Sequence, residues 1–326
     1  MERKRSALVL GATGGVGGAI AAALLRRGWH VRAMIRNPAT ANPRNAIEWV
    51  GGDAMQRDDV VRASRGADII VHAVNPPNYM HWDRLVLPMI DNTIAAAREA
   101  GGARIVLPGT IYNYDPARTP VIGSDTPQQP KSRKGKIRVA LEARLAQVAA
   151  DVPSLVLRAG DFFGPGVRSS WFSQAMISPA KPVRRIVNPA RGGGHSWAYL
   201  PDLAETFARL VEVPLKPLEV VQFEGLYDDD GTKLVDAIRR VCGRDLPVYG
   251  FPWWLMHLAA PFGGFPQEAA EIAPYWRHPA RFDNSRLVDL IGGEPRTALD
   301  DAVRASLLDM GSLATMAEPS LGANPA

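Results

Sequence analysis

A glycine-rich segment near the start of the chain has the residue types and spacing of a phosphate-binding loop. Gly11, Gly14 and Gly17 follow the apolar residues 8–10 at every third position. Gly11 permits a tight turn, Gly14 lets backbone N–H groups approach a pyrophosphate, and Gly17 lets the next helix pack closely on the strand. That helix would point the positive end of its dipole at the phosphates. The segment therefore indicates a dinucleotide site.

The strand predicted after this loop ends on a cation instead of an acid. Residues 11–47 contain no Asp or Glu, and Arg36 follows the expected strand at residues 31–35. An NAD site would carry an acidic residue there, about 20 residues after the loop, to bond the ribose 2′-OH. A guanidinium can instead grip a 2′-phosphate with two N–H donors. We therefore predict NADP(H) over NAD; the alternative is an ordinary surface arginine beside a simple glycine turn.

Composition bounds the class of protein. The chain has 326 residues, 46% of them hydrophobic and 22% charged, with a net charge of +5. No apolar run approaches the ~18 residues that span a bilayer, and no basic helix or aromatic platform suggests nucleic acid. Cys242 is the single cysteine and the six histidines are scattered, so we expect neither a disulfide nor a metal site.

These features lead to expectations about partners and location. The first strand follows the N-terminus without room for a signal peptide, so a cytoplasmic protein is expected. We expect a small-molecule substrate, with no nucleic-acid and no membrane partner. The oligomeric state is left open, and a homodimer is the assembly considered.

Apolar segments alternate with helical segments along the first half of the chain. This spacing predicts an α/β fold with a Rossmann-type doubly wound parallel sheet, whose ligands bind at the carboxyl ends of the strands. We expect a dinucleotide-binding core at residues 1–158, a smaller C-terminal substrate lobe at 159–311 with returns to the core sheet, and a loose tail at 312–326. The pair Trp253 and Trp254 is expected to pack inside this lobe. The expected strands are residues 8–10, 31–35, 47–50, 69–73, 104–107 and 155–157, with helices around 60–61, 84–100 and 135–150.

The chain resembles the extended short-chain dehydrogenase/reductases, often labelled NAD-dependent epimerase/dehydratases, over about residues 6–311. The glycine loop carries part of this resemblance. The other matching stretches are residues 52–53, 72–75, 158–165, 195–204, and 283–287 with 293–296. The resemblance implies that Asp53 meets the adenine, that residues 72–75 line the cofactor, and that Asp161 faces the nicotinamide end. The cofactor-binding residues expected in total are Gly11, Thr13, Gly14, Gly15, Val16, Gly17, Arg36, Asp53, Ala54, Ala73, Val74, Asn75, Arg138 and Asp161.

The catalytic motif departs from the family pattern. Family members carry Tyr-x-x-x-Lys, in which the phenol exchanges a proton with the substrate and the Lys holds the nicotinamide ribose. The flanking Pro130, Gly135 and Glu142 match, which places Lys134 at the Tyr position and Arg138 at the Lys position. Arg138 can still donate to the ribose hydroxyls, but it cannot release its proton. Lys134 replaces a phenol poorly unless desolvation lowers its pKa.

Other residues offer the missing chemistry. Thr110 matches the family's substrate-bonding Ser or Thr, since Tyr114 follows it as the family's loop Tyr does. Tyr112 is a candidate replacement acid, although it could simply pack the loop. Asp161 could be a base or could be held in a tight turn, and His195 could be an acid or base or a structural histidine.

Two functional classes remain open from the sequence. One is an NADP(H)-dependent oxidoreductase or epimerase-like enzyme on a small carbonyl or hydroxyl compound, with Thr110, Tyr112 and His195 as catalytic candidates. The other is a non-catalytic NADP(H)-sensing regulatory protein. A basic set hints at an anionic substrate, although such runs are often solvated surface. Its members are Arg118, Lys131, Arg133, Lys134, Lys136 and Arg138.

Overall fold

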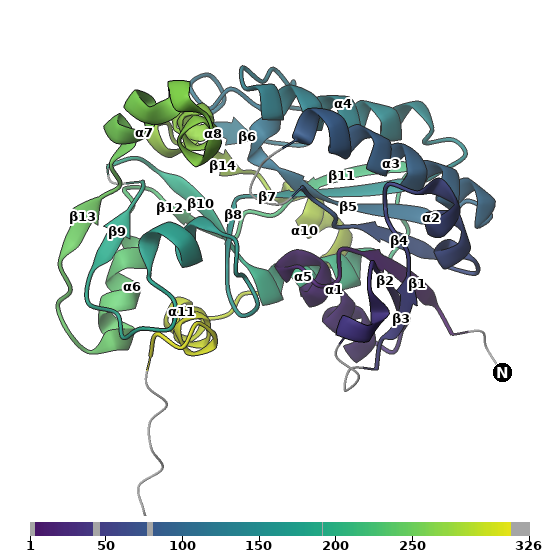
Figure 1. Cartoon of the computed structure of the whole chain (residues 1–326), viewed down its shortest axis with the longest axis horizontal. Coiled ribbons are helices and arrows are strands. Elements are labelled where there is room, and N and C mark those ends of the chain that lie inside the picture. The colour runs from purple at the N-terminus through teal and green to yellow at the C-terminus, as the bar shows by residue number, and fades with distance from the viewer. Residues whose placement is uncertain (1–3, 42–45, 77–80, 191, 314–326) are drawn as a thin grey trace, which may run out of the picture.

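The computed structural model describes residues 4–41, 46–76, 81–190 and 192–313. Seven parallel strands form the central sheet in the order β11-β7-β5-β4-β1-β2-β3 (Figure 1). Six of them lie where the sequence predicts strands, and the seventh, β11, comes from the second half of the chain. The strands are β1 (Ser6–Leu10), β2 (His30–Ile35), β3 (Glu48–Gly51), β4 (Ile69–His72), β5 (Arg104–Thr110), β7 (Ser154–Ala159) and β11 (Leu218–Gln222).

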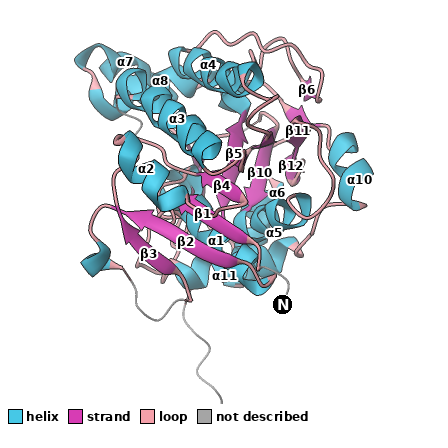
Figure 2. Cartoon of the chain, turned by 90° about the vertical axis from the view of Figure 1, so that its right-hand side faces the viewer, coloured by secondary structure: helices cyan, strands magenta, loops and turns pink. Residues whose placement is uncertain are grey.

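Helices cover both faces of this sheet, as the alternation in the sequence predicts (Figure 2). Side chains along a strand point alternately to the two faces. Leu8 and Leu10 of β1 accordingly join one buried cluster with residues of α2, α3 and α4. Ala7 and Val9 join a second buried cluster with residues of α1, α5 and α10. The helices are α1 (Gly15–Arg26), α2 (Arg57–Ser64), α3 (Trp82–Glu99), α4 (Arg133–Gln147), α5 (Leu200–Leu210) and α10 (Ser285–Ile291).

The strand register brings three loops to one edge of the sheet. Leu10, the last residue of β1, pairs with Met34 of β2 and with His72 of β4. Since these strands are parallel, the glycine loop, Arg36 and residues 73–76 all leave the sheet at its carboxyl edge. Ligands bind at this edge in open α/β sheets.

A smaller lobe follows residue 160 and is built on short strands and helices. The strands β8 (Asp161–Phe163), β10 (His195–Tyr199) and β12 (Leu226–Asp228) form a three-stranded sheet. Two further strand pairs are β9 (Ile186–Asn188) with β13 (Val248–Gly250), and β6 (Val121–Ile122) with β14 (Arg281–Phe282). The helices after residue 160 that have not yet been named are α6 (Lys233–Cys242), α7 (Trp253–Ala259), α8 (Gly264–Ile272), α9 (Pro274–Arg277) and α11 (Leu299–Asp309), with the short turns η4 (Phe172–Met176) and η5 (Ala260–Phe262). Two more short turns, η1 (Pro38–Thr40) and η3 (Ile111–Asn113), belong to the first half of the chain.

Aromatic side chains fill the interior of this lobe. Trp171 contacts Phe251, Trp253 and Trp276 with ring centroids 5.1–5.3 Å apart. The packing expected for the tryptophan pair is therefore confirmed for Trp253. It is wrong for Trp254, whose side chain is 69% exposed because it lies on the outer side of α7.

Two further expectations concern the chain outside its core. Most of the tail expected at 312–326 lies outside the described residues, which end at 313. Among the described helices, none has the length and apolar content to cross a membrane.

Candidate functional site

The glycine loop has a backbone shape that only glycine fits. Gly11 has φ of +87°, and a Cβ there would lie 2.5 Å from the carbonyl oxygen of Ala73. A Cβ on Gly17 would lie 2.3 Å from the carbonyl oxygen of Gly11, so α1 could not pack as closely on the loop. Gly14 donates its N–H to the Gly11 carbonyl over 3.0 Å and precedes the first residue of α1. The loop thus turns sharply at the carboxyl edge of β1.

The N-terminus of α1 is open to a negatively charged ligand. No side chain caps this helix, and its first turn contains no acidic residue. The first N–H groups of a helix have no partner within the helix, and the helix dipole adds positive potential at this end. A phosphate at this position would satisfy both.

Arg36 and Asp53 lie beyond the ends of β2 and β3. Arg36 is exposed and forms no ion pair with any residue that the structure describes. Asp53 accepts the N–H of Met55 at 3.0 Å and donates its own N–H to Asp59 Oδ2 at 3.0 Å. These bonds hold the turn in which Ala54 is buried. The side chain of Arg36 remains available for a ligand phosphate.

The segment after β4 contacts α4 through Arg138. The Arg138 guanidinium donates to Asn75 Oδ1 at 3.1 Å and lies over the Trp82 ring, 4.8 Å from its centroid. The preceding His72 is buried, and its pKa is lowered to about 3 by desolvation and by the charge of Arg138. It is therefore neutral at physiological pH. Thr93 donates its hydroxyl to the Met89 carbonyl, so His72 Nδ1 must donate to Thr93 Oγ1, 2.8 Å away.

Lys134, which the sequence resemblance implies stands in for the family's Tyr, is held inside the protein. Its side chain is fully buried and forms ion pairs with Glu268 and Glu271 of α8. The backbone N–H of Lys134 also donates to Glu271 Oε1 at 2.9 Å. Burial alone would raise the pKa of Glu271, but the hydrogen bonds and charge of Lys134 outweigh it and lower that pKa. Lys134 therefore joins α4 to α8.

The basic set is consequently not a free positive rim. Lys134 is inside the protein, which corrects the expectation that places it on the rim. Lys131 and Arg118 approach Asp115 Oδ2 at 2.8 and 3.8 Å, and Arg133 pairs with Glu268 at 3.3 Å. Three carboxylates thus pair with four of the six cations from which an anionic substrate is inferred.

Thr110 and Tyr112 lie where β5 ends. Thr110 Oγ1 accepts the N–H of Tyr112 at 3.4 Å and caps the short turn η3. The Tyr112 ring is buried and meets the Tyr275 ring edge-on, with centroids 5.1 Å apart. Tyr275 donates its hydroxyl to the carbonyls of Tyr112 and Tyr114 at 3.0 and 2.9 Å. Helix α9 therefore packs directly on this loop.

Asp161 and His195 form a buried pair across β8 and β10. His195 Nε2 lies 2.8 Å from Asp161 Oδ2, and Nδ1 lies 3.3 Å from the Tyr275 carbonyl. The imidazole stacks on Trp276, with centroids 3.7 Å apart and an interplanar angle of 11°. The 2.8 Å contact between Nε2 and Oδ2 needs one hydrogen, which the Nε2–H tautomer of the imidazole can supply. The pair therefore holds a proton between a histidine nitrogen and a carboxylate oxygen.

A buried polar network beneath the site is absent from the sequence prediction. Arg158, at the end of β7, bonds Glu142 of α4 and the Tyr114 hydroxyl. Asn113 Nδ2 donates to Glu142 Oε1 at 2.7 Å. Burial raises the pKa of Tyr114 to about 12. An arginine inside the apolar strand at 154–159 is the one signal that indicates such a network, because a buried guanidinium needs carboxylate partners.

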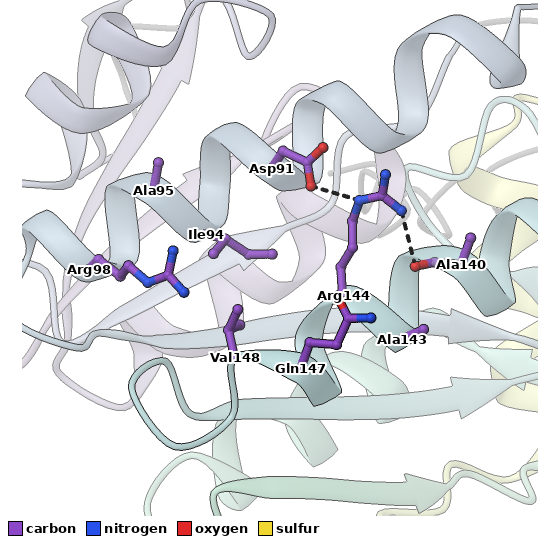
Figure 3. A pocket seen from close by; sticks show the side chains of 9 residues that line it. All are labelled: Asp91, Ile94, Ala95, Arg98, Ala140, Ala143, Arg144, Gln147 and Val148. Carbon is purple, nitrogen blue, oxygen red and sulfur yellow. Dashed lines mark hydrogen bonds and ion pairs between the residues drawn. The ribbon is translucent and has the colours of Figure 1, made fainter.

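Two pockets lie away from the carboxyl edge. One, of about 540 Å³, lies between α3 and α4, where Arg144 bonds Asp91 (Figure 3). The other, of about 90 Å³, lies in the C-terminal lobe among Trp171, Phe251 and Phe265. Neither is lined by an expected cofactor-binding residue.

Comparison with known proteins agrees with this geometry. Residues 11–144 match a family model described as NAD(P)H-binding. The chain is 29% identical over 174 residues to a 3-diazoavenalumate denitrifying reductase of a Streptomyces species. That alignment covers 49% of this chain and 57% of the reductase. The chain is also 26% identical over 196 residues to an isoflavone reductase homolog of Zea mays, which covers 57% of each chain. The chain thus matches somewhat over half the length of these curated relatives.

A solved structure extends the likeness to most of the chain. The UDP-glucose 4-epimerase of Bifidobacterium longum, in complex with NAD⁺ and UDP, superimposes with a TM-score of 0.70 and 15% identity, over 93% of this chain and 97% of that chain. The chain shares the fold of this epimerase, and the fold expected from the sequence resemblance is confirmed. Residues 11–144, which match the NAD(P)H-binding family model, contribute strands to the Rossmann-type sheet.

Proposed function

We propose that this protein is an NADP(H)-dependent oxidoreductase that reduces a small carbonyl compound or oxidises the corresponding alcohol. The observation that carries the proposal is the carboxyl edge of the sheet, where a glycine turn with no room for a Cβ at Gly11 or Gly17 meets the uncapped N-terminus of α1. These groups fit a pyrophosphate. The curated relatives named as reductases support the direction of the chemistry.

The choice of NADP(H) rests on Arg36. This exposed guanidinium follows β2 and has no carboxylate partner among the described residues. A guanidinium at this point is suited to a 2′-phosphate and has little use for a ribose diol. The remaining expected contacts are Asp53 and Ala54 toward the adenine, and Asn75 with Arg138 toward the nicotinamide ribose.

In a carbonyl reduction the substrate oxygen must receive a proton, and a group other than Lys134 must donate it. When bound, NADPH supplies the hydride. We assign the proton to the Asp161 and His195 pair, because a proton is already held between Nε2 and Oδ2. Asp161 is the partly exposed member of the pair, so it is the one that would meet a substrate. His195 would hold Asp161 in position and return a proton to it after each turnover. Thr110 would orient the substrate oxygen through its hydroxyl.

Tyr112 is the weaker candidate acid. Its ring is held edge-on against Tyr275, and the loop around it is fixed by the Tyr275 hydroxyl. This is the contact pattern of a packing residue. We therefore place Asp161 ahead of Tyr112 as the proton donor.

A screen of carbonyl compounds for NADPH consumption tests the proposal. We expect turnover in the wild type, a loss of about 10²-fold in kcat for Asp161→Asn, and a loss of less than ten-fold for Tyr112→Phe. NADPH affinity should be unchanged in both variants. A large loss for Tyr112→Phe with none for Asp161→Asn would reverse the assignment.

The second candidate function is a non-catalytic NADP(H) sensor. The specific observation in its favour is that Lys134 is sealed by two carboxylates at the position of the family's proton donor. A sensor would bind NADPH and consume none with any compound. Reproducible turnover that Asp161→Asn reduces would exclude it.

A further inference from the structure

The outer side of α7, η5 and α8 exposes a group of large apolar side chains. Phe262 is 91% exposed, Trp254 69% and Leu258 66%, and these three follow one another at intervals of four residues through α7 and η5. Leu255 and Phe265 are exposed beside them, and we call the five residues the α7–α8 patch. Soluble proteins rarely expose contiguous apolar groups of this kind unless the surface binds something.

The patch is a built surface on the C-terminal lobe. Figure 1 shows α7 and α8 together at one corner of the molecule, on the opposite side from β1, β2 and β3. On the inner side, Trp253 donates its indole N–H to the Pro189 carbonyl at 3.0 Å and packs on Trp171. Gly263 and Gly264, with φ of +82° and +66°, make the sharp turn between η5 and α8. The inner face is thus fixed while the outer face remains apolar.

Charge is arranged around the patch with one sign. No Asp, Glu, Lys or Arg occurs between Asp245 and Glu268. The two carboxylates of α8, Glu268 and Glu271, point inward to Lys134. Arg277 is exposed, lies 3.4 Å from His257 of α7 and has no carboxylate partner among the described residues, whereas Arg133 is paired with Glu268. The border therefore presents the cation of Arg277, and the acids of α8 are engaged by Lys134 and Arg133.

The patch also offers few hydrogen-bonding groups. Between Trp254 and Phe265 the side chains with a polar atom are the Trp254 indole and His257. Protein interfaces usually form about one hydrogen bond per 100–200 Å² of buried area. A surface of Trp, Leu and Phe edged by arginine is instead typical of segments that lie in the boundary between lipid headgroups and acyl chains. The lack of a spanning helix does not bear on contact with a membrane surface.

We propose that the α7–α8 patch docks on an anionic phospholipid surface. Phe262, Leu258 and Trp254 would enter the acyl boundary, and Arg277 would lie at the level of the lipid phosphates. The expectation of no membrane partner, which considered only spanning segments, is replaced by this peripheral contact. The inference is independent of the substrate and of the cofactor.

Flotation of the full-length protein with lipid vesicles tests the proposal. We expect it to float with phosphatidylcholine vesicles that contain phosphatidylserine and to bind pure phosphatidylcholine vesicles much more weakly. The double variant Leu258→Ser/Phe262→Ser should lower vesicle affinity by about ten-fold or more, since each side chain loses its burial in lipid. Raising the salt concentration should weaken binding partly, because only the electrostatic share is screened.

A matched control uses apolar side chains exposed elsewhere. Val288 of α10 and Leu308 of α11 are 41% and 40% exposed, and Val288→Ser/Leu308→Ser should float like the wild type. Thermal unfolding followed by circular dichroism should show one cooperative transition in all three proteins, which shows that each is folded. Absence of wild-type flotation, equal binding to both vesicle types, or unchanged binding of the patch variant would overturn the proposal. Light scattering that shows a dimer broken by Phe262→Ser would assign the patch to a second copy of the chain and would also overturn it.

Discussion

The glycine loop and the Lys134 region both lie at the carboxyl edge of the sheet, but they are built in different ways. The glycine loop leaves backbone N–H groups open and contains no acidic side chain. Around Lys134, by contrast, two carboxylates from α8 pair with a buried cation. The glycine loop therefore has unpaired backbone donors that suit an anionic ligand, whereas Lys134 is occupied in joining two helices, and this is the difference on which the proposed function depends.

Removing the Lys134 charge should cause the largest effect, a loss of free energy of unfolding. Lys134→Met leaves Glu268 and Glu271 with only the more exposed Arg133 beside them, and breaking a buried pair costs about 3 kcal/mol. Urea denaturation should show this loss at neutral pH. The triple variant Lys134→Met/Glu268→Gln/Glu271→Gln, which removes the whole cluster, should recover much of it. Unchanged stability of Lys134→Met, together with lost turnover, would show that Lys134 is catalytic instead.

The same cluster predicts a pH dependence. The folded pKa of Glu271 lies below its ordinary value of 4.5 because Lys134 outweighs the effect of burial. A carboxyl with a lowered pKa stabilises the fold above its ordinary pKa and loses that contribution as the pH falls through the folded value. The free energy of unfolding should therefore fall on acidification in the wild type. In Lys134→Met this slope should be smaller, and an identical slope would contradict the ion pair.

The addition of a single methyl group at Gly17 should test whether the glycine loop binds phosphate. Gly17→Ala places a Cβ against the Gly11 carbonyl, and overpacking of this kind costs roughly 2 to 3 kcal/mol, or about 10²-fold in NADPH affinity. Isothermal titration measures this. Gly123→Ala is a suitable control, because a Cβ there meets its nearest atom at 3.7 Å. Equal NADPH affinity in the two variants would show that the loop does not bind the phosphates.

Arg138 is the link between the two regions, and its loss should have a smaller effect. Arg138→Ala should weaken NADPH binding by about 1 to 2 kcal/mol, because the ribose loses hydrogen bonds and Asn75 loses its partner. Arg144→Ala, on the same helix but bonded to Asp91, should leave affinity unchanged. If both variants bind NADPH like the wild type, the register assigned to α4 is wrong.

The sequence was sufficient for the sheet and the loop because both depend on local patterns. Apolar strands bounded by helices predict six of the seven core strands, and glycine spacing predicts the turn after β1. Strand β11 has no such local mark, since its pairing with β7 depends on a return of the chain after more than fifty residues.

The candidate chemistry could be predicted only in part, because its partners are distant in the sequence. The types of Asp161 and His195 suggested proton chemistry, but their contact joins two strands that local periodicity does not pair. Glu268 and Glu271 lie over 130 positions from Lys134, and nothing near Lys134 indicates that it is buried. Trp254 looked like its neighbour Trp253, and only the placement of α7 separates the inner ring from the outer one.

The NADP(H) site is tested most directly by the affinities of NADPH and NADH for the wild type and for Arg36→Ala. Arg98→Ala is the control, because it removes an exposed arginine outside the expected cofactor site. A charge-assisted bidentate contact contributes roughly 1.5 to 3 kcal/mol, so NADPH should bind at least about ten-fold more tightly than NADH. Arg36→Ala should remove this preference while leaving NADH affinity nearly unchanged, and Arg98→Ala should retain it. Equal affinities in the wild type, or a preference that survives Arg36→Ala, would contradict an NADP(H) site at this edge of the sheet.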